Sequence, residues 1–401
     1  MFRPAPQEND VDDDAEQSAE IRKHNAGRIV HVAPRTELRR TAPLMIDTAD
    51  ALTAFAASVA SAPALALDTE FMREKTYRAD LCLLQIADAN SAVCVDPLAV
   101  PDFGALAPVL ASAACVKVMH AARQDLEVLL PAVGLVRPVF DTQIAAGLAG
   151  FPAQIGYAEL AKRLLGVELD KAHTRTDWAR RPLSADQQEY ALDDVRHLLA
   201  IRASLLETLA AKGRLGWLDE ELAGLDNADA LRVAPEDAWK KVKGLPSLDE
   251  GRQRLAQNLA AWRERRADER NRPRGWILDD VSLREIVLRL PRSLEALAAL
   301  PEMQESIVRK CGDDLLALVR DAGIPEPPPP LPRRERPDPE MLATVKRLAE
   351  IAATAAAELG IGPEVLATRR ELERVAAGRQ DVSLLRGWRK NVIGERLLSA
   401  L

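Results

Sequence analysis

Two carboxylates that follow an apolar segment are the first residues of this sequence that point to chemistry. Asp68 and Glu70 come after a run of apolar and small residues, 62–67, which is typical of a buried strand. Side chains two residues apart on a strand point to the same face, so these carboxylates would lie side by side. Two such charges raise each other's pKa unless a cation lies between them, and a divalent cation that prefers oxygen ligands meets that need. The alternative is a strand end that is acidic and hydrated.

Two more acidic groups lie further along the chain. Asp125 is expected in the first turn of a helix that follows a strand over 115–120, where the helix dipole favours a negative charge even without a catalytic role. Tyr190 and Asp194 are four residues apart on a predicted helix and face the same way. Asp193 lies nearly on that face, so spacing alone does not choose between the two aspartates. A solvated helix face is the alternative for this group.

These residue types together suit the hydrolysis of a phosphodiester. Two divalent ions a few ångströms apart need about four carboxylates, and they activate a water molecule and stabilise the leaving oxygen. A tyrosine hydroxyl beside them can orient the attacking water. If the fold brings the carboxylates together, the sequence predicts a metal-dependent hydrolase.

Composition sets bounds on the class of protein. The chain has 401 residues, enough for two or three domains, and a formal net charge of −7, which does not by itself indicate a nucleic-acid binder. The charge is uneven, however, because acidic residues gather in the first twenty positions and basic residues gather in 252–274 and 333–336. Four cysteines without a C-x-x-C pair predict reduced thiols and a cytoplasmic location. No secretory or membrane-spanning segment is expected, and therefore no membrane partner.

Patterning divides the chain into five parts. Residues 1–43 are polar and predict a disordered acidic extension. Residues 44–213 alternate strand and helix patterns, which predicts an α/β domain with a mixed sheet. Residues 214–322 and 340–401 are helical blocks, joined by a stiff proline-rich linker over 323–339. The blocks share an order of long helix, proline and apolar helix that favours duplication, although Ala- and Leu-rich helical hairpins resemble one another in any case.

The acidic motifs resemble those of the DEDD exonucleases, in the subgroup with tyrosine in the third motif, because Glu189 stands where the other subgroup has histidine. Longer stretches at 68–77, 81–87, 120–127 and 176–184 resemble the bacterial ribonuclease D family. The helical blocks resemble HRDC domains, with the match carried by 239–244, 261–264 and 271–276 in the first block and by 387–389 in a divergent second one. Residues 77–80 depart from the family pattern, which is more aromatic or contains proline.

The resemblance implies a ribonuclease H-like exonuclease domain followed by two HRDC-type domains. It implies a 3′-to-5′ exoribonuclease that hydrolyses RNA from its 3′ end to 5′-monophosphates by a two-metal mechanism, in tRNA 3′ maturation. It selects Asp194 over Asp193. Tyr190 would position the attacking water. Two Mg²⁺ or Mn²⁺ ions would be held by four carboxylates, those of Asp68, Glu70, Asp125 and Asp194.

Substrate contacts are also implied by the resemblance. Phe71 and Met72 would border the 3′-terminal nucleotide, with core packing as the alternative. Four polar side chains are further candidates for substrate binding, each with a structural alternative: His120, Gln143, Arg180 and Arg181. The basic segment 252–274, with Trp262 in it, is predicted to contact RNA, or else forms a solvated helix face.

The expected partner is RNA with a free 3′ end, above all a tRNA precursor, bound by a monomer. Two other functions stay open at this point. Proofreading DNA exonucleases share the carboxylates, and a non-catalytic RNA-binding module would use the helical blocks alone. The paired helical blocks disfavour the first, and the complete acidic set disfavours the second.

Overall fold

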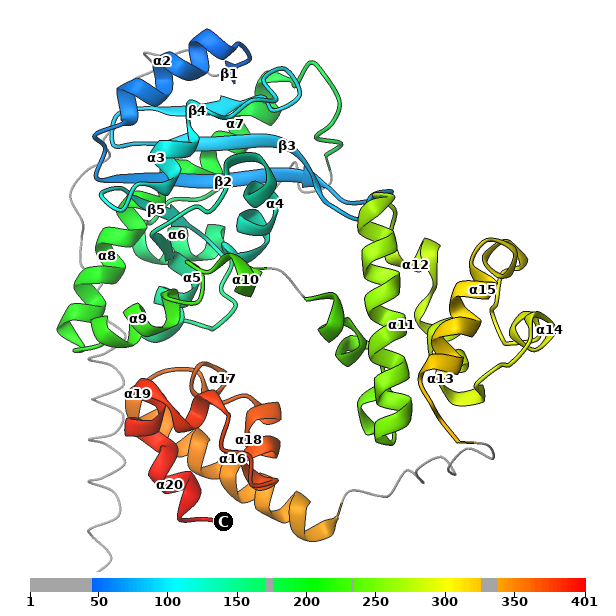
Figure 1. Ribbon diagram of the computed structural model, residues 1–401. Helices are drawn as coiled ribbons and strands as arrows, with labels where there is room; N and C mark the ends of the chain where they lie inside the picture. Colours follow the sequence, from blue (N-terminus) through cyan, green and yellow to red (C-terminus); the bar gives the residue numbers. More distant parts are fainter. Residues whose placement is uncertain (1–44, 170–175, 232–233, 326–337) are drawn as a thin grey trace, which may run out of the picture.

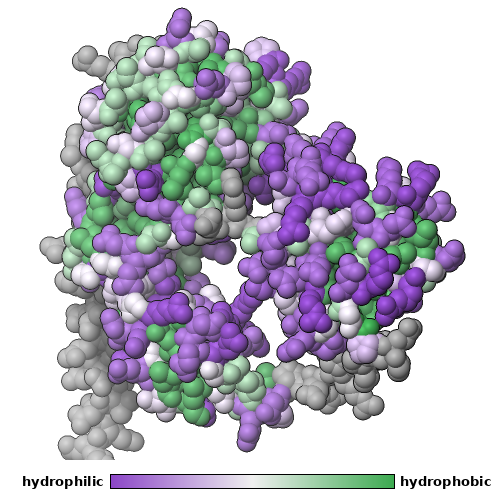
Figure 2. Space-filling view, in the orientation of Figure 1, coloured by the Kyte–Doolittle hydropathy of each residue, from purple (hydrophilic) through white to green (hydrophobic). Residues whose placement is uncertain are grey.

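A computed structural model describes residues 45–169, 176–231, 234–325 and 338–401. They form an α/β unit and two helical units arranged around an open gap (Figures 1 and 2). The predicted extension 1–43 and residues 326–337 of the proline-rich linker lie outside the described residues. Among the described helices, none is long and apolar enough to cross a bilayer.

The α/β unit is built on a six-stranded mixed sheet in the order β1-β4-β3-β2-β5-β6. β2 pairs antiparallel with β3 and parallel with β5, so the strand that carries Asp68 and Glu70 lies inside the sheet. Both carboxylates lie within β2 and not beyond its end, because pairing with β3 continues to Met72. The strands are β1 (Met45–Ile46), β2 (Ala64–Met72), β3 (Asp80–Ala87), β4 (Ala92–Val95), β5 (Val116–Met119) and β6 (Val139–Asp141).

Alternation along β2 explains how the two faces of the sheet differ. Leu65 and Leu67 point to one face, where they share a core with α2 (Ala49–Val59), α3 (Ala107–Ala111) and α4 (Arg123–Val133). Ala66 points to the other face and packs with α5 (Thr142–Ala149), α6 (Tyr157–Leu165) and α8 (Leu198–Ala211). Asp68 and Glu70 share that second face, which α7 (Ala185–Arg196) also covers.

The first helical unit has its own apolar core, which includes Leu255, Ile286 and Leu315. Polar contacts attach the unit to the β2–β3 hairpin: the Tyr77 hydroxyl donates to Glu264 at 2.8 Å, and Asn271 Oδ1 accepts from the backbone of Tyr77 at 3.1 Å. The unit comprises η1 (Pro235–Lys241), η2 (Leu245–Ser247), α11 (Glu250–Glu269), α12 (Arg274–Ile277), α13 (Asp280–Arg289), α14 (Leu294–Ala298) and α15 (Glu305–Asp321).

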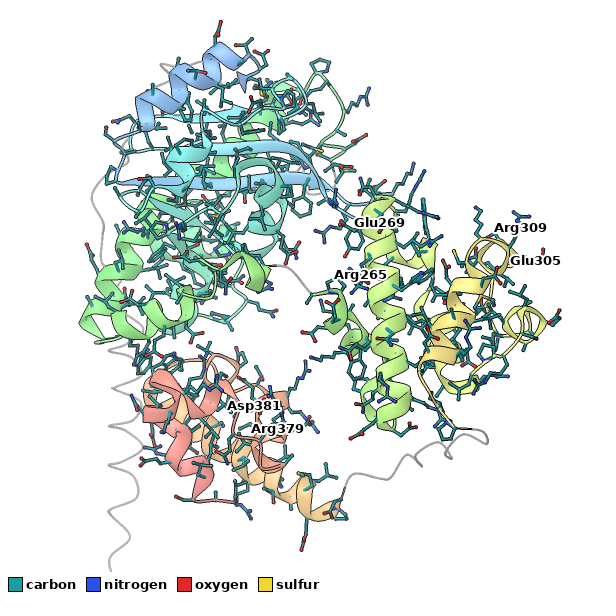
Figure 3. The ribbon with its side chains drawn as sticks, viewed as in Figure 1. Arg265, Glu269, Glu305, Arg309, Arg379 and Asp381 are labelled. Atoms are coloured by element: carbon teal, nitrogen blue, oxygen red, sulfur yellow. The ribbon has the colours of Figure 1, made fainter. Side chains whose placement is uncertain are left out.

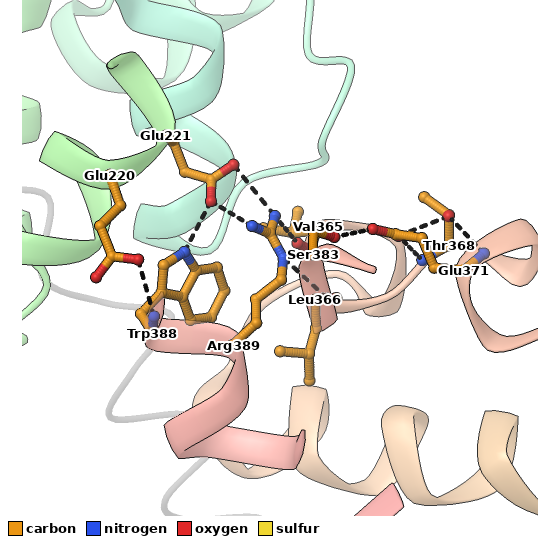
Figure 4. Close-up of polar contacts among 9 residues, drawn as sticks. All are labelled: Glu220, Glu221, Val365, Leu366, Thr368, Glu371, Ser383, Trp388 and Arg389. Carbon is orange, nitrogen blue, oxygen red and sulfur yellow. Dashed lines mark hydrogen bonds and ion pairs between the residues drawn. The ribbon is translucent and has the colours of Figure 1, made fainter. Parts of the chain in front are cut away.

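The second helical unit shares one continuous apolar core with the α/β unit. Trp388 stacks on Trp217 of α9 (Leu215–Leu222), with ring centroids 4.3 Å apart. Its ring nitrogen donates to Glu221 at 2.8 Å, and Arg389 pairs with the same carboxylate (Figure 4). The unit comprises α16 (Pro339–Leu359), α17 (Pro363–Leu366), α18 (Arg369–Ala376), η3 (Ser383–Leu385), α19 (Gly387–Arg389), η4 (Lys390–Gly394) and α20 (Glu395–Leu398).

The segment between the α/β unit and the first helical unit packs on the former. Leu218 of α9 belongs to the core that faces α5 and α8. Leu225, and Leu231 at the end of α10 (Ala228–Leu231), pack into the core on the opposite face of the sheet. Residues 214–231, predicted as part of the first helical block, therefore extend the α/β unit in the structure, because their apolar side chains find partners there.

Substitution of Gly150 tests how closely the second helical unit must approach the α/β unit. Gly150 has φ +110°, and an added Cβ would lie 2.6 Å from the carbonyl oxygen of Gly360. We expect Gly150→Ala to lower the free energy of unfolding by more than the roughly 1–3 kcal/mol that backbone strain alone costs. The control is Gly166→Ala, which has φ +69° and open space around its Cβ. Equal losses in the two variants, measured by chemical denaturation, would show that the approach is not tight.

Candidate active site

Asp68, Glu70 and Asp194 form a cluster of carboxylates on the face of the sheet that α5, α6, α7 and α8 cover. One oxygen from each lies within 4.8 Å of the others, a spacing at which they can share a metal ion. The first two come from β2 and the third from α7, which lies over β3 and β4. The structure therefore brings together residues up to 126 positions apart in sequence.

The neighbours Asp193 and Asp194 have different environments. The Asp193 carboxylate accepts from Arg196 at 2.5 Å, and its backbone carbonyl accepts from the Tyr157 hydroxyl at 2.8 Å. These contacts hold α7 so that Asp194 faces the β2 carboxylates. The helix is fixed at its start by the predicted capping box, in which Ser184 and Gln187 bond reciprocally. Contacts that spacing did not reveal thus separate the two aspartates.

Asp125 lies beside the cluster but is held differently. It stands in the first turn of α4, is 8% exposed, and accepts from the Thr69 hydroxyl at 2.5 Å. Thr69 lies between the two β2 carboxylates in sequence, so this bond ties α4 to the strand that carries them. Asp125 is not one of the three residues within 4.8 Å, yet its charge contributes to the raised pKa of Asp68.

Burial raises the pKa of every carboxyl in the group, and repulsion from neighbouring carboxylates adds to it, from Asp193 in the case of Asp194 and from Asp141 in the case of Asp125. Burial is the larger cause throughout: it raises the pKa of Asp68 well above its usual value, with the charges of Asp125, Asp194 and Glu70 adding to it. The pKa of Glu70 rises to about 8, that of Asp194 to about 7, and that of Asp125 to about 6. Carboxylates that lose solvation and repel one another form an all-oxygen donor set, which fits Mg²⁺ or Mn²⁺.

Tyr190 and the loop before α7 form a layer next to the cluster. Tyr190 stacks on Trp178, with ring centroids 6.3 Å apart. Arg181 donates to both oxygens of Asp96, at 2.7 and 2.8 Å, and to the carbonyl of Trp178 at 2.7 Å. Its guanidinium therefore fixes this loop to the end of β4, while Arg180 is exposed.

The remaining predicted substrate contacts lie around the same face. His120 is bonded on both sides, since its Nδ1 is 2.9 Å from the Thr142 hydroxyl and its Nε2 is 2.9 Å from the Ile155 carbonyl. Gln143 donates to that carbonyl at 3.1 Å. Phe71 and Met72 are half-buried at the end of β2. Contact of these residues with a substrate stays a prediction.

Sequence reasoning missed Tyr157. Its buried hydroxyl holds the backbone of α7 at Asp193, and its ring centroid lies 5.9 Å from that of His120. Burial raises its pKa well above the usual value, and the charge of Asp194 adds to this. The sequence shows only an aromatic residue after Gly156 at the start of an amphipathic helix, a pattern that also describes ordinary core packing.

Comparison with known proteins decides the family. Residues 43–210 match the 3′-5′ exonuclease family model, and residues 252–319 match the HRDC domain model. The protein is 37% identical over 374 residues to ribonuclease D of Granulibacter bethesdensis, covering 90% of this chain and 93% of that one. It is 39% identical to ribonuclease D of Jannaschia sp. over 368 residues, covering 90% and 95%.

The chain belongs to the ribonuclease D family.

The structural comparison agrees with this assignment. The crystal structure of Escherichia coli RNase D, described as an exoribonuclease involved in structured RNA processing, superimposes with a TM-score of 0.79 at 34% identity, covering 89% of this chain and 98% of that one. The catalytic core of RRP6 from Trypanosoma brucei gives 0.55 at 26% identity, covering 76% and 88%. The predicted family and the exoribonuclease class are confirmed, as are the mixed α/β domain and one HRDC domain.

The carboxylate pKa values predict how metal and pH affect stability. The folded carboxyls of Glu70 and Asp194 hold protons that the unfolded chain has lost, so the metal-free protein becomes less stable as pH rises from about 5 towards 8. Excess Mg²⁺ should offset the repulsion and raise Tm more at pH 8 than at about pH 5. Thermal unfolding with Na⁺ at matched ionic strength is the control. An equal Mg²⁺ effect at both pH values would contradict the electrostatic account.

Proposed function

We propose that this member of the ribonuclease D family hydrolyses RNA from its 3′ end to 5′-monophosphates at the carboxylate cluster. The observation that carries the proposal is the convergence of Asp68, Glu70 and Asp194 to within 4.8 Å. Asp125 would complete the ligand set for two ions, because it is adjacent to β2 and buried. Mg²⁺ and Mn²⁺ are the cations that such a donor set suits.

When bound, the ions would supply an activated water and neutralise charge on the scissile phosphate. The protein's own part is to position these groups. Thr69 fixes the orientation of Asp125, and Arg196 holds Asp193 away from the site. Tyr190 lies one turn before Asp194 on α7 and would hold the attacking water through its hydroxyl. Trp178, stacked on the tyrosine ring, limits its movement.

Adjacent aspartates provide a matched test of the site. Asp194→Asn removes a carboxylate from the cluster and should lower the rate of nucleotide release by about 100-fold or more, as loss of metal-site groups does. Asp193→Asn removes one of the two carboxylates that Arg196 pairs with, since Glu189 remains, and should leave most of the activity. Gel assays on RNA and DNA oligomers of one sequence, with and without EDTA, measure both. Equal loss in the two variants would refute the assignment, and faster hydrolysis of DNA would favour a DNA exonuclease.

The substrate path would continue along α11 of the first helical unit. A groove of about 600 Å³ is lined there by side chains that suit phosphates, base edges and base stacking, including Arg265, Gln257 and Trp262. Figure 3 shows Arg265 and Glu269 on the side of α11 that faces the α/β unit. Figure 2 shows largely hydrophilic surface on both sides of the gap between these units. This is the basic segment that the sequence predicted to contact RNA.

The β2–β3 hairpin fixes this groove relative to the carboxylates. Its Tyr77 and Arg78 bond to Glu264, Asp268 and Asn271 of the helical unit, and its first strand carries Asp68. A structured RNA would therefore rest its body on α11 while its 3′ end reaches β2. This arrangement supports a tRNA precursor as substrate, which a monomer with this geometry would bind unaided.

Substitution of one exposed arginine on each side of the first helical unit tests whether RNA follows the proposed path along α11. Arg265→Ala should raise KM for a tRNA with a 3′ trailer by about 3- to 10-fold, as expected for a lost phosphate contact, and leave hydrolysis of a short oligomer unchanged. The control is Arg309→Ala on α15, which Figure 3 places on the side of the unit away from the gap. The path is wrong if both variants behave alike, or if Arg265→Ala slows the short substrate equally.

The C-terminal unit supports the proposal of a second, divergent HRDC-type domain. Each helical unit has a long helix, a four-residue helix and a capped short helix in the same order, α11-α12-α13 and α16-α17-α18. Their buried residues stand at one constant offset in residue number: Ala256 and Val345, Leu259 and Leu348, Ala267 and Ala356, Leu283 and Leu372, Ile286 and Val375. This common register supports duplication over a chance likeness of two helical hairpins.

A further inference from the structure

Gln85 is a buried polar residue whose side chain has no role in the fold described above. It is 0% exposed, and within the described part of the chain neither its amide oxygen nor its amide nitrogen has a hydrogen-bond partner. Leaving such a group without bonds in the interior costs about 1–3 kcal/mol, whereas an apolar side chain of the same size would avoid that cost. The sequence therefore keeps an amide here at the expense of stability.

The sheet register places this amide next to the carboxylates. Gln85 lies directly opposite Asp68 on β2 and directly opposite Cys94 on β4. Its neighbours Leu84 and Ile86 point into the core on the other face of the sheet. Since successive strand residues alternate, Gln85 points to the face that holds Asp68 and that α7 covers.

Distance and chemistry then select its partner. Directly opposed residues of an antiparallel pair have Cβ atoms about 4.5–5.5 Å apart, so the longer glutamine side chain can reach the Asp68 carboxylate. On its other side lies Cys94, whose pKa burial raises to about 12, so this thiol stays neutral and binds weakly. The charges of Arg196, Glu189 and Glu70 also act on Cys94, and the other neighbours, such as Leu83 and Leu192, are apolar. Arg196 already holds Glu189 in an ion pair, so Asp68 is the acceptor that the register places directly opposite Gln85.

We propose that Gln85 is a positioning residue for Asp68. When a cation is bound, rotation of the Gln85 side chain would bring its amide N–H to the Asp68 carboxylate oxygen that does not face the cation. This bond, which the two described side chains do not make in the structure, would fix the other oxygen towards the cation. A carboxylate ligand needs such a donor behind it to hold one orientation, and loss of the donor weakens metal affinity. This inference rests on the proposed function of the cluster and adds to it a residue outside the acidic motifs.

The test separates a positioning role from a structural one. Gln85→Met replaces the amide by an apolar side chain of similar length, so Tm of the metal-free protein should stay unchanged or rise. The Kd for Mn²⁺, measured by electron paramagnetic resonance on the full chain without RNA, should increase by about 10- to 100-fold. Cys94→Ala, on the opposite side of Gln85, is the control and should lower Tm without changing that Kd.

Contrary outcomes are distinct. A lower Tm with an unchanged Kd for Mn²⁺ would make Gln85 a structural residue and overturn the inference. If Gln85→Met does not fold, the same two measurements on Gln85→Leu replace it. The proposed function fails separately if Asp68→Asn binds Mn²⁺ as tightly as the unsubstituted protein. If Asp68→Asn loses Mn²⁺ and both Gln85 variants keep it, only the role of Gln85 is wrong.

Discussion

The crowding of partly buried carboxylates, which lose solvation and repel one another, is the constraint on which the arrangement of this protein depends. Placing Asp68, Glu70 and Asp194 within 4.8 Å on a covered face of a sheet is unfavourable, as their raised pKa values show. The surrounding elements hold them there regardless. β2 is paired on both sides, and α7 is fixed by its capping box and by the Tyr157 hydroxyl. Relief of this electrostatic cost is what would give the cluster an affinity for divalent cations.

The two helical units are attached to the α/β unit by different kinds of contact. The first is held by polar contacts at the tip of the hairpin that begins with the β2 carboxylates. The second is joined by a shared apolar core and by the bonds that Trp388 and Arg389 make to Glu221 (Figure 4). The C-terminal unit therefore behaves as an extension of the α/β unit, whereas the hairpin couples the HRDC domain directly to the strand that carries the carboxylates.

Much of the site followed from local sequence. Strand alternation placed Asp68 and Glu70 together, and the first-turn position of Asp125 and the capping box of α7 are local features as well. Tertiary contacts supplied the rest. Spacing did not separate Asp193 from Asp194, because contacts of Asp193 with Arg196 and with Tyr157 on another helix determine which of the two faces the cluster.

Other features were outside the reach of sequence patterns for the same reason. Gln85 reads as one polar residue in an apolar strand until the register sets it opposite Asp68. Residues 214–231 have a helical pattern that fits either neighbouring unit, and only their packing assigns them to the α/β unit. The docking of Tyr77 on Glu264 joins residues from distant parts of the chain, which no periodicity encodes.

Anomalous diffraction from crystals grown with Mn²⁺ and a non-hydrolysable RNA 3′ end would test the central claim most directly. The account predicts two anomalous peaks, both within coordination distance of oxygens from Asp68, Glu70, Asp125 or Asp194, with the terminal phosphodiester between them. A map with no peak at these carboxylates, or with Mn²⁺ bound only elsewhere, would contradict it.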